Sequence, residues 1–298
     1  MPLAIGVLAA ENIVAGLVEN DQLVGSIHTY PEASHRRDIF EGLPTEDIVQ
    51  KIFEQIEAVR GGQEIAAVGL GFPGFIQNDV VQECPNIPQV KGYNICALLT
   101  AALRDAKLNT KVSLLNDADA IAAGIAVEQG EVGKLIRIWF LGNGVGCGHY
   151  PLIGEVMEEG HMVVTLDPKE NFCGCGGIGH LEGIMGYRAM RLRFLDLEPE
   201  EVFAEAQQGD ERCVEFVKLW HRALAAATAS SIHMYGAGKF YISGPNAKFV
   251  SVNLLQEYLY EMVKMSSLQG SSFETVSTTE EIAIIGAAHS ALLANGQV

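Results

Sequence analysis

Two cysteines and two histidines lie close together in the second half of the chain. Cys173 and Cys175 are one residue apart, His161 lies twelve residues before them and His180 five residues after. Thiolate and imidazole are ligands that tetrahedral zinc prefers, and a closed set of four leaves no open position for water. Glycines between these cysteines and His180 let a short loop fold tightly around an ion. The pattern predicts a structural zinc site; the alternative is a glycine-rich turn with two free thiols and two surface histidines.

A second polar group follows an apolar run. Residues 112–115 predict a short strand, Asn116 and Asp117 follow it, and the alanine-rich segment 118–128 predicts a helix. A carboxylate at such a junction often faces a ligand at the carboxyl edge of a sheet. N-capping of the helix by Asn116, Asp117 or Asp119 is the alternative that requires no ligand.

Two further segments contain several glycines. Residues 69–74 predict a buried strand that runs into Pro73-Gly74, and residues 141–148 alternate glycine with other residues. Taken alone, either segment indicates only a tight turn.

These residues need a frame of strands and helices to position them. Each half of the chain begins with three predicted strands and continues with alternating helices and strands, a pattern typical of mixed sheets covered by helices. We expect a small N-terminal α/β domain at 1–115, completed by a last helix at about 283–298, and a larger C-terminal α/β domain at 116–282. The predicted strands include 4–8, 13–18, 23–29, 65–72, 135–141, 145–153 and 162–166, and the predicted helices include 45–59, 181–193, 213–234 and 281–294.

Composition excludes several functional classes. The 298 residues include 20 Lys and Arg against 37 Asp and Glu, a net charge of −17, which disfavours nucleic acid and anionic membrane as partners. No uninterrupted apolar run approaches the roughly 20 residues that span a bilayer. We therefore expect a cytoplasmic protein whose remaining cysteines are reduced thiols. An alanine-rich helix face at 223–229 suits close packing.

The segment from His161 to Glu182 resembles the signature of the ROK family of repressors, open reading frames and sugar kinases. The family pattern is Gly-Glu-x-Gly-His, then Cys-x-Cys-Gly-x-x-Gly-Cys-x-Glu, and here His180 replaces the third cysteine and Met157 the first glycine. The resemblance continues from Ile5 to the last helix. It implies an α/β actin-like ATPase or hexokinase-type fold, with two mixed-sheet domains around a cleft. It also implies that His161, Cys173, Cys175 and His180 bind structural zinc.

The same resemblance implies a sugar site. The segment around Asn116 is similar to the family element Glu-Asn-Asp-Ala-Asn-Ala, with Leu115 and Asp119 as departures. Asp117 would then be the general base that takes the proton of the attacking sugar hydroxyl. The implied sugar-binding residues are Gly74, Asn86, Asn116, Asp117, Glu158, His161 and Glu182.

The nucleotide elements depart from the family pattern. In the first hairpin the flanks around residues 5–7 and 12–17 align, but the aspartate, both glycines and the threonine are missing, and Glu11 places a negative charge in the turn. A carboxylate near a phosphate costs about 1 kcal/mol if exposed and several if water is excluded. The third element keeps one glycine, followed by Pro245, which has no N–H to donate. The implied nucleotide-binding residues are Gly142, Asn143, Gly144, Gly146 and Gly244.

Two main hypotheses follow. The first is a glucokinase-like enzyme that phosphorylates a hexose with ATP and Mg²⁺, with weak activity or an unusual donor because of the altered first hairpin. The second is a sugar-binding pseudokinase, sensor or partner subunit that no longer uses ATP productively. A third, less specific hypothesis is an interaction protein that keeps only the fold stabilised by zinc. No helix-turn-helix precedes Ala4, so we expect no DNA binding. Family members are often oligomers, so we expect a homo-oligomer, a dimer.

Overall fold

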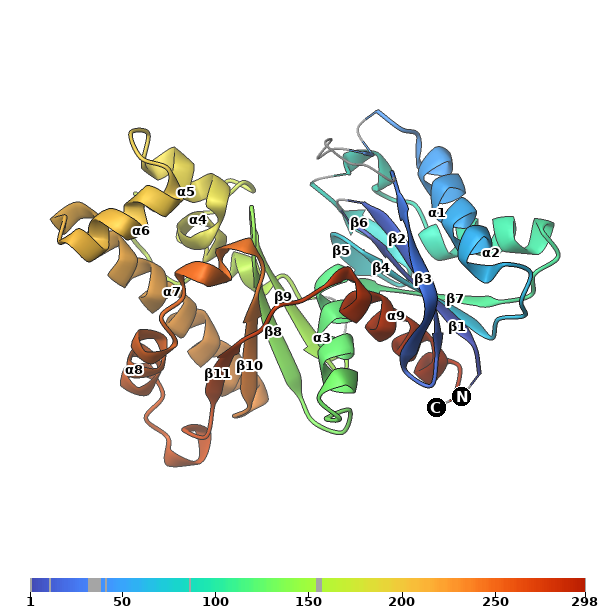
Figure 1. Ribbon diagram of the computed structural model, residues 1–298. Helices are drawn as coiled ribbons and strands as arrows, with labels where there is room; N and C mark the ends of the chain where they lie inside the picture. The colour runs from blue at the N-terminus through green and yellow to red at the C-terminus, as the bar shows by residue number, and fades with distance from the viewer. Residues whose placement is uncertain are drawn as a thin grey trace. The chain divides into compact units, whose positions relative to one another are not determined.

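The computed structural model describes residues 2–10, 12–31, 39–40, 42–85, 87–153 and 157–297. The chain forms two compact units, and each combines a sheet with helices, which confirms the predicted α/β class (Figure 1). The first unit comprises Met1–Ile136, Gly148–Met157 and Thr278–Val298, and the second comprises Arg137–Cys147 and Glu158–Ser277.

A five-stranded sheet in the order β3-β2-β1-β4-β7 forms the centre of the first unit. Strands β1, β2 and β3 pair antiparallel, whereas β1, β4 and β7 run parallel, so the carboxyl ends of β4 and β7 lie at the same edge. A small hairpin, β5–β6, follows β4. The strands are β1 Ala4–Ala9, β2 Ile13–Glu19, β3 Gln22–Tyr30, β4 Ala67–Phe72, β5 Phe75–Gln77, β6 Val80–Glu83 and β7 Lys111–Asn116.

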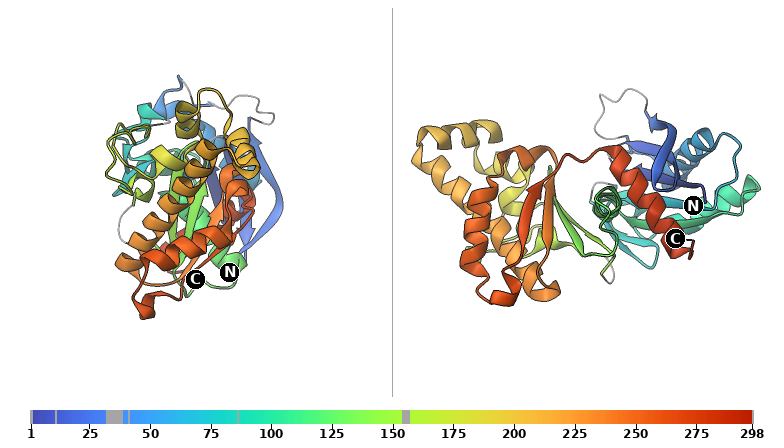
Figure 2. Two further views of the ribbon diagram at one scale, coloured as in Figure 1. Left: turned by 90° about the vertical axis from the view of Figure 1, so that its left-hand side faces the viewer. Right: turned by 60° about the horizontal axis from the view of Figure 1, so that its bottom comes forward.

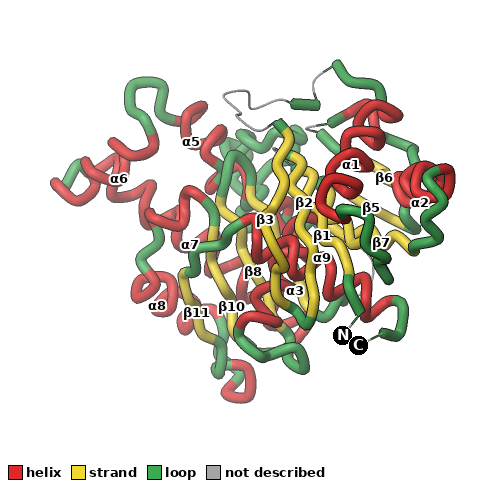
Figure 3. Tube along the Cα trace, turned by 45° about the vertical axis from the view of Figure 1, so that its right-hand side comes forward, coloured by secondary structure: helices red, strands yellow, loops and turns green. Residues whose placement is uncertain are grey.

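Helices cover both faces of this sheet. Helices α1 and α2 pack on the face that carries Ile5 and Val7, and α9 packs on the opposite face, beside α3 (Figure 1). The ends of the described chain lie close together in this unit (Figure 3). The helices are α1 Thr45–Arg60, α2 Ile95–Asp105, α3 Asp117–Glu128 and α9 Glu280–Ala294, with a short 3₁₀ turn at Pro88–Val90.

Glycines allow α9 to approach its neighbours at backbone distance. A Cβ atom on Gly6 would lie 1.9 Å from the carbonyl oxygen of Ile284, and one on Gly124 of α3 would lie 1.9 Å from that of Ile282. Because real Cβ atoms do not come this close, only glycine fits at these crossings. Helix α3 is therefore packed into the first unit, which extends beyond the segment 1–115 expected from the sequence.

The second unit has a four-stranded sheet in the order β11-β10-β8-β9, with α7 and α8 on one face (Figure 2). Trp139 of β8 donates a hydrogen bond to Thr228 of α7 at 3.0 Å, inside the main core of the unit. The alanines at 223, 225, 227 and 229 are buried, and this core accounts for their small size. The elements are β8 Ile136–Leu141, β9 Val145–Tyr150, β10 Lys239–Ser243, β11 Ser272–Thr275, α4 Glu182–Met185, α5 Tyr187–Arg193, α6 Pro199–Gln208, α7 Glu211–Tyr235 and α8 Val252–Met262, with 3₁₀ turns at Glu159–His161, Pro245–Phe249 and Ser266–Leu268.

Two sequence-based expectations are wrong in this unit. The predicted strand at 162–166 is a loop in which Val163 makes a single bridge to His180, because this segment folds back on the cysteine loop. The predicted helix at 181–193 is broken at Gly186 into α4 and α5. A Cβ on Gly186 would lie 2.7 Å from the carbonyl oxygen of Asn143, so the break brings α5 against the β8–β9 turn.

Candidate metal, sugar and nucleotide sites

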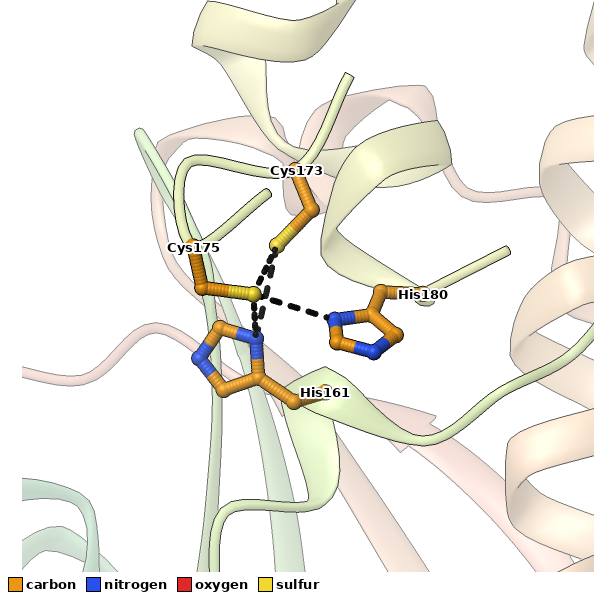
Figure 4. A group of neighbouring side chains, drawn as sticks. All are labelled: His161, Cys173, Cys175 and His180. Atoms are coloured by element: carbon orange, nitrogen blue, oxygen red, sulfur yellow. Dashed lines mark hydrogen bonds between the residues drawn. The ribbon is translucent and has the colours of Figure 1, made fainter. Parts of the chain in front are cut away.

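The predicted metal ligands converge in the second unit (Figure 4). The Sγ atoms of Cys173 and Cys175 are 3.4 Å apart, and the Sγ of Cys175 lies 3.5 Å from Nδ1 of His161 and 3.3 Å from Nδ1 of His180. For Zn–S bonds of about 2.3 Å and Zn–N bonds of about 2.0 Å, tetrahedral geometry sets ligand atoms roughly 3.3–3.8 Å apart. The four side chains therefore fit a tetrahedral metal ion.

The surroundings of the cluster shift the pKa of two of the predicted ligands. Burial raises the pKa of the Cys173 thiol to about 12, and the side chains of Cys175 and Glu182 add to this rise. Burial lowers the pKa of His180, as does the adjacent His161 ring, and the neutral imidazole is the form that binds a metal. A bound cation would deprotonate the thiols, since thiolate is the form that coordinates zinc.

The loop that carries the cysteines is held by contacts outside the ligand set. Arg193 of α5 binds both carboxylate oxygens of Glu170, and its guanidinium also lies over the ring of Phe172. A Cβ on Gly177 would lie 2.0 Å from Cε1 of His180, so this glycine makes room for the ring. The loop is thus held in shape around the cluster by contacts that do not involve the four predicted ligands.

Both glutamates that the family pattern assigns to sugar lie beside predicted metal ligands. Oε2 of Glu158 is 4.0 Å from Nε2 of His161, the ring nitrogen that faces away from the cysteines. Oε1 of Glu182 lies 3.4 Å from Sγ of Cys173. Desolvation raises the pKa of Glu158, an effect that the His161 ring opposes and the charge of Glu182 reinforces. Carboxylates beside metal-binding histidines commonly fix the orientation of the ring.

In the first unit, Asn116 and Asp117 lie where β7 ends and α3 begins. The side-chain oxygens of both residues accept a hydrogen bond from the amide of Ala118 at 2.9 Å, so the capping interaction foreseen as the alternative is present. The side-chain amide of Asn116 also donates to the carbonyl oxygen of Gly74 at 3.1 Å. This bond brings the turn after β4 and the end of β7 together at one sheet edge.

Gly74 is required by its backbone and its neighbours. Its φ of +101° lies in the region that favours glycine, and an added Cβ would lie 2.4 Å from the carbonyl oxygen of Glu83. Asn86, the remaining sugar residue expected from the sequence, lies outside the described residues, as does Glu11 of the first hairpin.

The β1–β2 hairpin is regular on both sides of its turn. Pairing continues in register from Ala4 opposite Val18 to Ala9 opposite Ile13, and the amide of Ala10 donates to the carbonyl oxygen of Asn12 at 3.1 Å. The strands of the expected first phosphate hairpin are therefore formed, without the glycines of the family turn.

The β8–β9 turn is anchored on several sides. The amide of Tyr187 donates to the carbonyl oxygen of Gly142 at 3.0 Å, and that of Arg188 to the carbonyl oxygen of Asn143 at 3.3 Å. Asn246, which is buried, also donates its side-chain amide to Gly142, at 2.8 Å. Asn246 was not singled out from the sequence; a polar residue three positions after a buried strand was the available signal.

Gly244 connects β10 to this turn. Its φ is +92°, and a Cβ would lie 2.5 Å from the carbonyl oxygen of Leu141. The second and third elements expected to bind nucleotide, residues 142–146 and 244, are thus in direct contact within one unit.

Comparison with known proteins agrees with these features. The sequence profile of the ROK family matches residues 27–292. The chain belongs to the ROK family. The glucokinase of Thermotoga maritima is 31% identical over 277 residues, covering 82% of this chain and 84% of that protein. The glucokinase of Pyrobaculum calidifontis is 29% identical over 249 residues, covering 78% and 81%.

Solved structures give the fold. The ROK hexokinase from Thermus thermophilus superposes with a TM-score of 0.79 at 25% identity, covering 99% of this chain and all of that one. The fold is the actin-like ATPase fold of the ROK hexokinases, and the chain is sugar-kinase-like, as the sequence predicts. No helix among the described residues is long and apolar enough to cross a membrane.

Proposed function

We propose that this ROK chain phosphorylates a glucose-like hexose at a primary hydroxyl, with ATP and Mg²⁺ as donor. The similarity to two glucokinases supports the substrate class. The observation that carries the proposal is the Asn116-Asp117 pair, which stands at the carboxyl edge of the sheet with Asn116 bonded to the Gly74 turn. Ligands of open α/β sheets bind at this edge.

In the proposed reaction, Asp117 accepts the proton of the sugar's primary hydroxyl as its oxygen attacks the γ-phosphorus of ATP. The new O–P bond forms as the bond to the bridging oxygen breaks, so ADP leaves with the bonding electrons. Asp117 fits this role because its Oδ1 binds the Ala118 amide, which fixes the carboxylate at the first turn of α3. Glu158, His161 and Glu182 would hold sugar hydroxyls, and zinc on the four-residue cluster would be structural.

The proposed enzyme is tested with a matched pair of carboxamide variants. Asp117→Asn removes the base but keeps a hydrogen-bond acceptor, and general-base catalysis contributes roughly 10²–10⁴-fold in rate. Asp119→Asn, two residues along, is the control, because Asp119 accepts the amide of His149 through Oδ1, and an asparagine oxygen can do the same. We expect hexose phosphate from wild type and Asp119→Asn, and a loss of at least 100-fold for Asp117→Asn.

One observation favours a second candidate, a sugar-binding protein that does not use ATP. The β1–β2 turn has no glycine, and in the β8–β9 turn the amide of Val145 already donates to a carboxylate, Glu182, at 3.3 Å. A carboxylate near a phosphate weakens binding. No hexose phosphate from wild type with any donor, together with hexose binding, would favour this candidate. Equal product formation by wild type and Asp117→Asn would instead refute the role of Asp117 as the base.

We also propose that the protein forms a dimer and that it is located in the cytoplasm. A dimer is tested by light scattering after size-exclusion chromatography, where a mass near twice that of one chain supports it. Cytoplasmic location follows from the proposed use of ATP and is tested by fractionation of the source cells.

A further inference from the structure

Glu182 holds two separate parts of the second unit with one carboxylate. Its Oε1 lies 3.4 Å from Sγ of Cys173 in the metal cluster. Its Oε2 accepts the backbone amide of Val145 at the end of the β8–β9 turn, at 3.3 Å. Hydrogen bonds to an ionised group are stronger than those between neutral groups. The carboxylate therefore contacts both the four-residue cluster and the β8–β9 turn, whose residues 142–146 we call the glycine hairpin.

The glycine hairpin is shaped to accept this carboxylate. A Cβ on Gly144 would lie 2.3 Å from Oε2 of Glu182, whereas one on Gly142 would make only ordinary contacts with the ring of Phe140. The absence of a side chain at position 144 thus has a specific use here, which is to admit Glu182. Position 142 of the same turn has no such requirement.

The segment that carries Glu182 is in turn fixed by the cluster. Glu182 begins α4, two residues after the metal ligand His180, and the amide of Gly183 donates to the carbonyl oxygen of His180 at 3.0 Å. A Cβ on Gly183 would lie 2.9 Å from the backbone nitrogen of Cys173, so α4 packs directly against the cysteine loop. Movement of the loop would therefore displace α4 and its carboxylate.

We propose that Glu182 is a positioning residue that couples metal occupancy of the cluster to the order of the glycine hairpin at residues 142–146. Metal binding would convert the Cys173 thiol, which donates to Glu182 here, into a thiolate, so the coupling runs through the backbone. The metal fixes the cysteine loop, the loop fixes α4 through the close packing of Gly183 on Cys173, and α4 places Glu182 on the Val145 amide. Because binding free energies are reciprocal, the hairpin must influence metal affinity by the same factor. The inference rests on the proposed zinc site and does not require sugar phosphorylation.

Hydrogen exchange of the whole protein tests the first direction. Zinc-loaded and chelator-treated wild type are compared in the peptide that covers residues 142–146. Loss of one charge-assisted hydrogen bond predicts exchange faster by on the order of tenfold without zinc. In Glu182→Ala, which removes the acceptor of the Val145 amide, the hairpin should exchange fast in both states, so that zinc removal adds nothing. Glu170→Ala is the matched control, because it removes the clamp to Arg193 in the same loop but leaves Glu182 in place.

Zinc affinity, measured by chelator competition, tests the reverse direction. Gly144→Ala would push the flexible end of Glu182 away, so we expect zinc affinity to fall several-fold, by the coupling factor seen in exchange. Gly142→Ala alters the same turn without touching Glu182 and should leave zinc affinity unchanged.

Three results would overturn the proposal: no zinc bound by elemental analysis, hairpin exchange in wild type that is indifferent to zinc, or the same zinc response in Glu182→Ala as in wild type. None of these measurements uses catalysis. A protein that shows the coupling yet phosphorylates no sugar would refute the kinase proposal alone.

Discussion

The two turns that the family resemblance predicts to be phosphate hairpins differ in how they are held. The β8–β9 turn is bonded by Tyr187, Arg188 and Asn246 and contacts Glu182. The β1–β2 turn has lost the family's glycines, although the strands beside it pair in full register and are buried. The fold depends on buried strands, whereas ligand chemistry depends on the turn between them. A turn can therefore change without disturbing the architecture.

The largest expected effect is on the free energy of unfolding, when the two cysteines of the cluster near the β8–β9 turn are replaced. Cys173→Ser with Cys175→Ser should lower the free energy of unfolding by about 3 kcal/mol or more, because a closed metal site contributes folding energy. Thermal unfolding measures the loss. Chelator-treated wild type should melt at the temperature of the variant; a variant as stable as the zinc-loaded protein would contradict a structural metal.

Gly244→Ala tests the close packing between the end of β10 and the start of the β8–β9 turn. The φ of +92° and the 2.5 Å approach to the carbonyl oxygen of Leu141 predict destabilisation of roughly 2–4 kcal/mol. Gly209→Ala has a similar φ of +95° but open space around the added Cβ, and should cost only about 1 kcal/mol. Denaturant unfolding of both variants gives the difference, and equal losses would show that the contact with the turn contributes nothing.

A smaller effect is expected in the altered turn. Glu11→Gln removes the negative charge and should tighten ATP binding by up to about fivefold, the equivalent of roughly 1 kcal/mol. Calorimetric titration with ATP and Mg²⁺ measures the change. An unchanged affinity would show that the missing glycines, rather than the charge, limit nucleotide binding.

The smallest expected effect is on the pH dependence of stability, through His221 of α7 and its bond to Ser251 at the start of α8. His221 donates through Nδ1 to the carbonyl oxygen of Val217 and accepts the Ser251 amide through Nε2, so its ring must be neutral. Burial lowers its pKa below the ordinary value of about 6.5. The resulting stability is present above pH 6.5 and is lost as the pH falls below it. Melting temperatures from pH 8 to 5 should fall more in wild type than in His221→Gln.

The sequence predicted the metal set and the Asn116-Asp117 junction because ligand spacing and a strand-to-helix boundary are local patterns. It failed at residues 162–166 and at Gly186, where backbone contacts with distant segments override local apolar periodicity. It also missed the contacts of Glu182 with Val145 and Cys173, since the approach of Gly144 to a carboxylate almost forty positions later leaves no local signal.

Calorimetric titration of a hexose, followed by ATP with Mg²⁺, tests the proposed kinase most directly. The account predicts that glucose or a related hexose binds first and that ATP then binds to the sugar-loaded protein. Tight binding of a hexose with no heat from ATP, in wild type and in Glu11→Gln alike, would contradict it.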